Sequence, residues 1–151
     1  MDEITIRYAT EADLPFIVNC QLNMALETEN LALNDSVVNK GVEAVFNDPL
    51  KGFYIVGESG DTLCSCLMIT LEWSDWRNNW VWWLQSVYVM PPMRQSGIFG
   101  MMYAFVKSLV SEKTDVAGIR LYVDNTNLRA REVYKRLGMT DEHYRVFEWM
   151  K

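Results

Sequence analysis

The stretch that decides the fold is VYVMPPMRQSGIFG, residues 87–100. It leads from an apolar run, through two prolines, into a segment with apolar residues at helical spacing. The glycine at position 97 lets the backbone make a tight approach. The first N–H groups of a helix have no partner inside it and lie at the positive end of its dipole. The stretch therefore predicts a strand–loop–helix junction able to hold a phosphate group, with Arg94 adding positive charge.

The residues before this junction predict a central strand. Trp80–Val89 is apolar on both alternating faces and is interrupted only by Gln85 and Ser86, which is typical of a strand covered on both sides. Gly52–Ser59 and Thr62–Leu71 are rich in β-formers and are separated by a glycine-containing turn. We expect them to form a hairpin that precedes the central strand.

Periodicity and capping residues predict the remaining elements. In chain order these are a strand at Ile4–Tyr8, a helix from Leu14 after capping residues Thr10 to Asp13, helices at Ser36–Phe46 and Gly97–Val110, a strand at Gly118–Val123, a helix at Leu128–Leu137 stopped by Gly138, and a strand at Tyr144–Met150. A hairpin-rich half is thus followed by alternating strands and helices. We predict an α+β fold and a single domain over residues 1–151.

Composition limits the classes of function. The 151 residues are 50% hydrophobic with a net charge of −6, and no basic run supplies the surface that nucleic acid requires. No apolar stretch is long enough for a membrane span, and Asp2 and Glu3 are unlike a signal peptide, so we expect a cytoplasmic protein. Three cysteines and the single His143 lack metal-ligand spacing. We expect reduced cysteines and no metal.

Two motifs resemble those of the GNAT N-acetyltransferase superfamily. Arg94-x-x-Gly97, after Val-x-Pro, resembles the acyl-CoA signature Arg/Gln-x-x-Gly-x-Gly/Ala. Asn127 to Met139 resembles the family's Asn-x-x-Ala-x-x-x-Tyr-x-x-x-Gly-Phe motif, with Met139 replacing the aromatic residue. The opening residues from Ile6 to Leu14 are also similar to the start of many family members. The resemblance covers nearly the whole chain.

The resemblance implies a GNAT fold, a mixed central β-sheet splayed in the middle with helices on both faces. It implies acetyl-CoA as co-substrate, with pantetheine between the strand ending at Val89 and the strand at Gly118–Val123. The chain departs from the signature at Phe99, where the family has Gly or Ala; we expect this ring to point into the core. The residues implied to bind the coenzyme are Val87, Tyr88, Val89, Arg94, Gln95, Ser96, Gly97, Ile98, Phe99, Gly100, Asn127 and Tyr134.

The resemblance also implies direct attack of an amine on the thioester. Tyr134 matches the family position for the acid that protonates the departing thiolate. A lysine-like amine is mostly protonated at pH 7, so a proton acceptor or water path is expected. Trp80–Val89 contains no Asp or Glu. Glu72 is the preferred base, directly or through water, while a solvated turn is the alternative reading of its surroundings.

The acceptor is the least determined part. A small cationic amine is the first hypothesis, and the side chains expected to contact it are Glu27, Glu29, Asp75, Trp76 and Gln85. Glu27 and Glu29 are also alternative bases. The rival hypotheses are a protein lysine or N-terminus as acceptor, a non-catalytic acyl-CoA-binding module, and a dimerisation domain pairing through Tyr144–Met150. A homodimer is compatible with each of them.

Overall fold

The computed structural model describes residues 3–151, so Asp2 lies outside the described part of the chain. The described chain forms two compact units, one ending at Arg120 and the other spanning Leu121–Lys151. The prediction of one domain over residues 1–151 stays a prediction.

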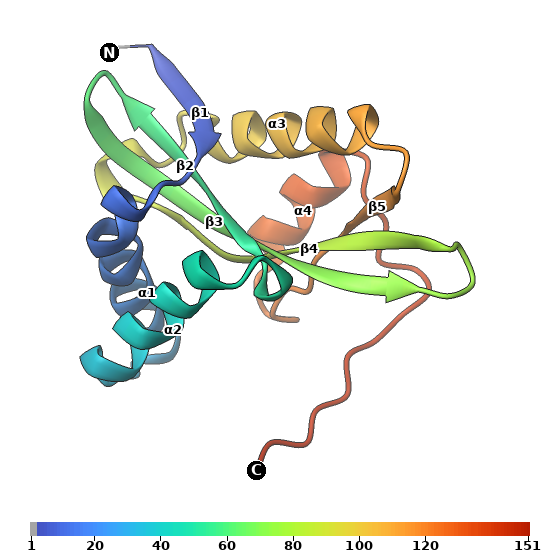
Figure 1. The fold of residues 1–151 in the computed structure, drawn as a ribbon, viewed down its shortest axis with the longest axis horizontal. Coiled ribbons are helices and arrows are strands. Elements are labelled where there is room, and N and C mark those ends of the chain that lie inside the picture. Colours follow the sequence, from blue (N-terminus) through green and yellow to red (C-terminus); the bar gives the residue numbers. More distant parts are fainter. Residues whose placement is uncertain (1–2) are drawn as a thin grey trace. The chain divides into compact units, whose positions relative to one another are not determined.

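The first unit is built on a five-stranded sheet with strand order β1-β2-β3-β4-β5 (Figure 1). Neighbouring strands are antiparallel except for β4 and β5, which run parallel. The predicted hairpin is therefore confirmed, and the sheet is mixed. The strands are β1 (Ile4–Tyr8), β2 (Phe53–Ser59), β3 (Thr62–Ser74), β4 (Asn79–Val89) and β5 (Val116–Arg120).

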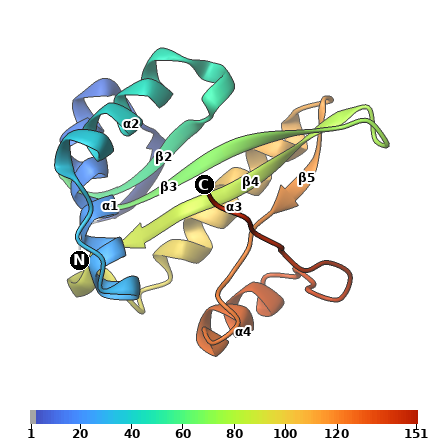
Figure 2. The same ribbon diagram turned by 90° about the horizontal axis from the view of Figure 1, so that it is seen from below.

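Helices cover both faces of this sheet, as the predicted fold requires (Figure 2). α1 (Leu14–Glu29) and α2 (Asp35–Asn47) pack against Tyr54 and Val56 of β2 and their cross-strand neighbours. Ile55, between those two residues, is also fully buried and points to the opposite face because side chains alternate along a strand. α3 (Ile98–Glu112) contacts β1, β2 and β5. The core is thus divided by the sheet into two layers.

An ion-pair network fixes the entry into α1. The Arg7 guanidinium donates to both oxygens of Asp13, at 2.8 and 3.1 Å, and to Glu58 on β2 at 2.9 Å. Asp13 also accepts the backbone N–H of Thr10 at 2.7 Å, which confirms the predicted capping residues and forms the short 3-10 turn η1 (Glu11–Asp13). The Arg7 hydrogen bonds hold the pKa of the buried Asp13 carboxyl below its ordinary value.

Gly52 is required where the chain passes β3. It lies between the 3-10 turn η2 (Pro49–Lys51) and β2, at φ 124°, a conformation that side chains rarely adopt. A Cβ on this residue would collide with the backbone oxygen of Ile69. Glycine at position 52 therefore permits the close start of the β2–β3 ladder.

The second unit contains one regular element, α4 (Leu128–Arg136). The Asn127 side chain caps its first turn by accepting the Ala130 N–H at 3.1 Å. Gly138 follows the helix at φ 89°, and Met139 N–H bonds back to the Tyr134 carbonyl at 3.1 Å. The predicted stop at Gly138 is confirmed, with its physical cause.

Two strand predictions in the last third are corrected. The strand predicted at Gly118–Val123 is β5, and it runs from Val116 to Arg120. The strand predicted at Tyr144–Met150 is wrong, because residues 139–151, all of which the structure describes, form no strand. A β-strand needs a neighbour for its backbone groups, and an alternating sequence alone does not supply one. Phe147 and Trp149 are accordingly 96% and 87% exposed.

Glycine-to-alanine substitutions at two positions should have opposite effects on stability. Gly52→Ala should lower the free energy of unfolding by about 3 kcal/mol, because it combines a positive φ with a backbone collision. Gly41→Ala, at an exposed position inside α2 where a Cβ meets no described atom within 4 Å, should raise it by about 0.5–1 kcal/mol. Urea denaturation of both variants checks the pair, and equal effects would contradict the conformation assigned to Gly52.

Acid should destabilise the protein partly through Asp13. Its folded-state pKa is depressed, so its stabilising contribution is present above its ordinary value of 3.8 and is lost as the pH falls through the lower folded value. Asp13→Asn should be about 2 kcal/mol less stable at pH 7 and should depend less on pH below about 4. Denaturant midpoints from pH 2 to 7 test this, with the exposed Asp61→Asn as the matched control.

Candidate functional site

The sheet opens along β4. β5 pairs only with Trp80 to Trp83, whereas β4 continues to Val89. Within residues 3–151, no strand pairs with that edge of residues 84–89. The predicted splay is therefore present, and it places the backbone of Val87, Tyr88 and Val89 on the open half of the strand.

A bulge bends β4 at the start of this open half. Cys66 pairs with Tyr88 and Met68 with Gln85, so that Leu67 faces both Ser86 and Val87. Ser86 has φ 51°, which is unusual for a residue other than glycine. Bulges increase the local twist and are common beside active sites. On the other side of the bulge, Gln85 donates to the Thr70 hydroxyl at 2.5 Å, which orients the amide.

The junction after β4 has the predicted form. A 3-10 turn, η3 (Pro91–Met93), leads to α3, and Gly97 at φ 79° is the N-cap residue. Gln95 also has a positive φ, of 66°, and the Ser96 hydroxyl donates to the Met93 carbonyl. No side chain of the described chain caps α3. Its first turn is thus an uncapped helix N-terminus next to the open half of β4.

The glycine positions of the junction leave room for a ligand. A Cβ on Gly97 or Gly100 would meet no described atom within 4 Å. Ile98 is the buried anchor of the first turn, at 2% exposure. Phe99, expected in the core, is half-buried, with its ring centroid 6.4 Å from that of Tyr103. The room and the uncapped amides fit a diphosphate.

Arg94 is held by protein groups. Its Nε donates to the Val89 carbonyl at 2.9 Å and its Nη2 to Glu27 at 2.7 Å. The guanidinium carbon lies 5.2 Å from the centroid of the Tyr88 ring, and the Tyr88 hydroxyl donates to the other Glu27 oxygen at 2.6 Å. The Tyr88 and Arg94 hydrogen bonds lower the pKa of Glu27, while burial and Glu27 raise that of Tyr88 to about 12.

The remaining acidic and aromatic candidates lie elsewhere in the first unit. Glu72 pairs with Arg120 at 2.6 Å and lies opposite Val81, in the half of β4 that β5 closes. At ~3.3 Å per residue, Val81 is roughly 20 Å along the strand from Val87. Asp75 and Trp76 are exposed in the β3–β4 turn, and Glu29 is exposed at the end of α1. Among the acidic candidates in residues 3–151, Glu27 alone contacts the open half, through Tyr88, and Gln85 lies within it.

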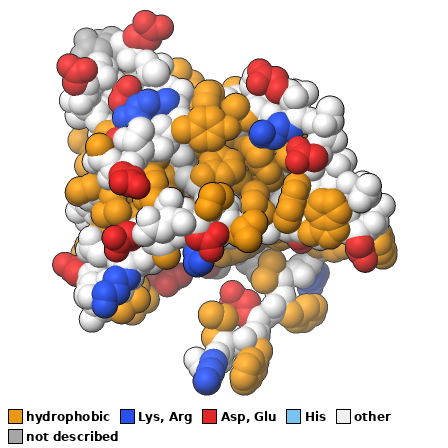
Figure 3. All heavy atoms as spheres, viewed as in Figure 1, with side chains coloured by type: hydrophobic (Ala, Val, Ile, Leu, Met, Phe, Trp, Pro, Cys, Tyr) orange, Lys and Arg blue, Asp and Glu red, His pale blue; other side chains and the backbone are white. Residues whose placement is uncertain are grey.

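Exposed apolar side chains are not confined to the candidate site. Figure 3 shows them over much of one face, with acidic and basic side chains scattered among them. In the first unit, Trp73 and Trp76 are 51% and 89% exposed. No helix of the described residues is long and apolar enough to cross a membrane. The His, Cys, Asp and Glu side chains of the described residues form no group of three or more that could hold a metal ion.

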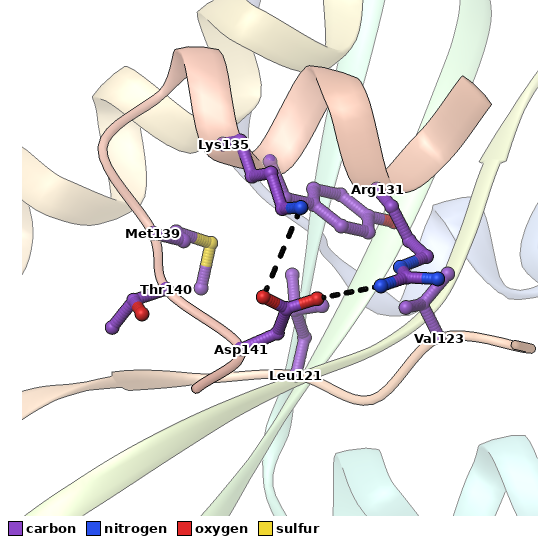
Figure 4. Close-up of a pocket in the computed structure, with 8 residues that line it drawn as sticks. Leu121, Val123, Arg131, Lys135, Met139, Thr140 and Asp141 are labelled. Carbon is purple, nitrogen blue, oxygen red and sulfur yellow. Dashed lines mark hydrogen bonds and ion pairs between the residues drawn. The ribbon is translucent and has the colours of Figure 1, made fainter. Parts of the chain in front are cut away.

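In the second unit, Tyr134 lines a small cavity of about 50 Å³ (Figure 4). Arg131 and Lys135 of α4 both reach Asp141, at 2.9 and 3.9 Å. Burial raises the pKa of Tyr134, so its hydroxyl stays protonated at neutral pH. The Asn127 side chain, predicted to bind coenzyme, is engaged in capping α4.

Sequence reasoning missed three partners at these sites. Thr70 orients Gln85, Arg120 neutralises Glu72, and Glu27 takes the guanidinium of Arg94. Each contact joins residues at least 15 positions apart. The sequence contains no local signal for pairs so far apart. Opposite charge is compatible with the two ion pairs but does not predict them.

Comparisons with known proteins agree on the class of fold. The sequence model described as "Acetyltransferase (GNAT) family" matches residues 22–139. A structure described as a possible acetyltransferase from Clostridium difficile 630 is 38% identical, with a TM-score of 0.91, and the alignment covers 98% of this chain and 97% of that one. No protein with a curated description matched the chain.

More distant structures share the fold alone. One is AAC(6')-Iy in complex with the bisubstrate analog CoA-S-monomethyl-acetylneamine, 14% identical over 99% of both chains, with a TM-score of 0.79. Another is the aminoglycoside acetyltransferase meta-AAC0020 from an uncultured soil metagenomic sample, in complex with trehalose. It is 17% identical over 98% of this chain and 95% of that one, with a TM-score of 0.79.

The open mixed sheet and these likenesses define an α+β domain of the acetyltransferase class. More narrowly, the chain belongs to the GNAT acetyltransferase family, because the family's model matches most of its length. The resemblance inferred from residues 94–97 and 127–139 is thereby confirmed.

Proposed function

We propose that the protein is an acetyl-CoA-dependent N-acetyltransferase that acetylates a primary amine of a small cationic molecule. The observation that carries this proposal is the open half of β4 beside the uncapped start of α3. Unpaired strand groups suit the amides of pantetheine, and helix amides suit a diphosphate. When bound, the coenzyme supplies the acetyl group as a thioester.

A small cationic acceptor is favoured by charge and by fold relatives. The net charge of −6 attracts cations. Two structures of the same fold are described as aminoglycoside acetyltransferases or bound to an acetylated neamine analog. Among the predicted acceptor residues, Gln85 lies in the open half of β4 and Glu27 bonds to Tyr88 of that half, so we propose these two as facing the acceptor, while the predicted contacts of Glu29, Asp75 and Trp76 stay predictions.

The proposed reaction is direct transfer. The neutral amine attacks the thioester carbonyl, the carbon–sulfur bond breaks, and the thiolate takes a proton from the Tyr134 hydroxyl. The new amide nitrogen gives its extra proton to water, and the Tyr134 phenolate regains a proton from solvent. Because Glu72 is paired with Arg120 and lies in the closed half of the sheet, we propose that it accepts a proton only through water. A carboxylate in direct contact with the amine is not required when water can carry the proton away.

Coenzyme binding and turnover test the proposal directly. Calorimetry should show one acetyl-CoA bound per chain, and thiol release should occur with cationic amines such as aminoglycosides or polyamines. Gly97→Ala should weaken binding roughly tenfold, because the methyl group occupies the space beside the helix amides and φ 79° is strained. Binding without thiol release across amines, peptides and proteins would instead identify a non-catalytic module.

Tyr134→Phe should lower turnover more than coenzyme affinity. Loss of a general acid costs roughly 10²-fold in kcat, whereas the ring that remains preserves packing. Since burial raises the pKa of Tyr134 above its ordinary value of 10, wild-type activity should show little loss from this group below about pH 9. Steady-state kinetics from pH 6 to 10.5 measure both effects, and equal turnover of the two proteins would remove the acid role.

A further inference from the structure

Three side chains from three separate elements meet at the end of β4. They are Glu27 in the last turn of α1, Tyr88 on β4, and Arg94 in the segment before α3. Each Glu27 oxygen has its own donor, the Tyr88 hydroxyl at 2.6 Å and Arg94 Nη2 at 2.7 Å. We call this group the Glu27 clasp.

The clasp uses the part of Arg94 that would best grip a phosphate. An arginine binds phosphate most specifically through two parallel N–H groups on one edge of the guanidinium. In Arg94, the Nε–Nη2 edge donates to the Val89 carbonyl and to Glu27. The Tyr88 ring lies against the face of the same group, 5.2 Å from its central carbon. Three protein contacts therefore set the orientation of the guanidinium.

The clasp also restrains the segment from Met90 to Gly97. This segment carries two residues in left-handed backbone conformation, Gln95 and Gly97, and the first costs free energy because it has a side chain. Arg94 connects the segment to β4 through Val89 and to α1 through Glu27. A strained loop persists only when its surroundings fix it. The clasp supplies two such fixed points.

We propose that Glu27 is a positioning residue for coenzyme binding. Its carboxylate holds Arg94, and Arg94 holds the segment that presents the first amides of α3. Arg94 then contributes to affinity by shaping the loop, and the helix amides contact the diphosphate. This inference rests on the proposed function, because it assigns the diphosphate to the start of α3.

The Glu27→Gln variant gives opposite results under the two possible roles of this carboxylate. Simple electrostatics predicts tighter binding of an anionic coenzyme when a nearby negative charge is removed. The clasp predicts weaker binding, because glutamine loses the charge-assisted bond to Arg94. We expect the dissociation constant of acetyl-CoA to rise roughly tenfold. The KM for acetyl-CoA should rise equally. An unchanged or lower dissociation constant would overturn the proposal.

Arg94→Lys separates shape from charge. A lysine still attracts phosphate as a point charge, so Arg94→Lys would keep most of the affinity for acetyl-CoA if Arg94 bound the phosphate directly. If Arg94 positions the loop, the affinity would be lost, because lysine cannot bond Val89 and Glu27 at the same time. We expect Arg94→Lys to bind acetyl-CoA as weakly as Arg94→Gln, and the Glu27→Gln/Arg94→Gln double variant to be no weaker than Arg94→Gln. Additive losses would contradict the clasp.

Two further measurements complete the test. Glu43→Gln on α2 removes the same charge from an exposed site and should leave the dissociation constant within about twofold of wild type. Amide hydrogen exchange without coenzyme should be faster in residues 93–97 of Glu27→Gln than of wild type. If wild type bound no acetyl-CoA, the proposed function would fail, and the exchange result alone would still decide whether Glu27 holds the loop; unchanged exchange would refute it.

Discussion

The structure depends on the hydrogen bonds that β4 makes along its second edge, which stop at Trp83. Before that point β4 lies between β3 and β5, and beyond it β3 is the only strand of the described residues that pairs with β4. Backbone N–H and C=O groups at such an edge need partners from water or from a ligand. The bulge at Ser86 adds twist where the two strands part. The open edge is therefore a consequence of strand geometry, and the rest of the candidate site is arranged around it.

Two of the four described non-glycine residues with positive φ lie around this opening, and the other two are Asn30 and Asn78. Ser86 and Gln95 have positive φ, and so does Gly97 at the entry to α3. Each costs about 1 kcal/mol or more unless the residue is glycine. The neighbouring contacts are correspondingly dense, since Arg94 bonds to β4 and α1 within the same region. Strain and the contacts that retain it thus occur together, as expected for a preformed binding loop.

Local patterns predicted most of the elements but few of their contacts. The hairpin, the two-sided apolar strand and the glycine-marked helix ends follow from alternation, turn chemistry and caps. The strand predicted at Tyr144–Met150 was wrong, because an alternating sequence indicates the two faces of a strand but does not supply the neighbouring strand that its backbone needs. At the site, the motif predicted the role of Gly97 at the start of α3. It did not predict that one edge of the Arg94 guanidinium is bonded to Glu27, which is 67 residues away in sequence. The predicted roles of Tyr134 and Glu72 stay predictions.

The chemistry of acyl transfer explains why the open half can lack a free carboxylate. A neutral amine and a thioester give an amide and a thiol with no net gain or loss of protons. A base is needed only to remove the extra proton of the ammonium form, which an amine of lower pKa largely lacks at neutral pH. Residues 79–89 contain no Asp or Glu, and Glu27 is already bonded to Tyr88 and Arg94. For the proposed reaction, such a site would favour acceptors whose amine is easily deprotonated, and multiply charged amines meet this condition because neighbouring ammonium groups lower one another's pKa.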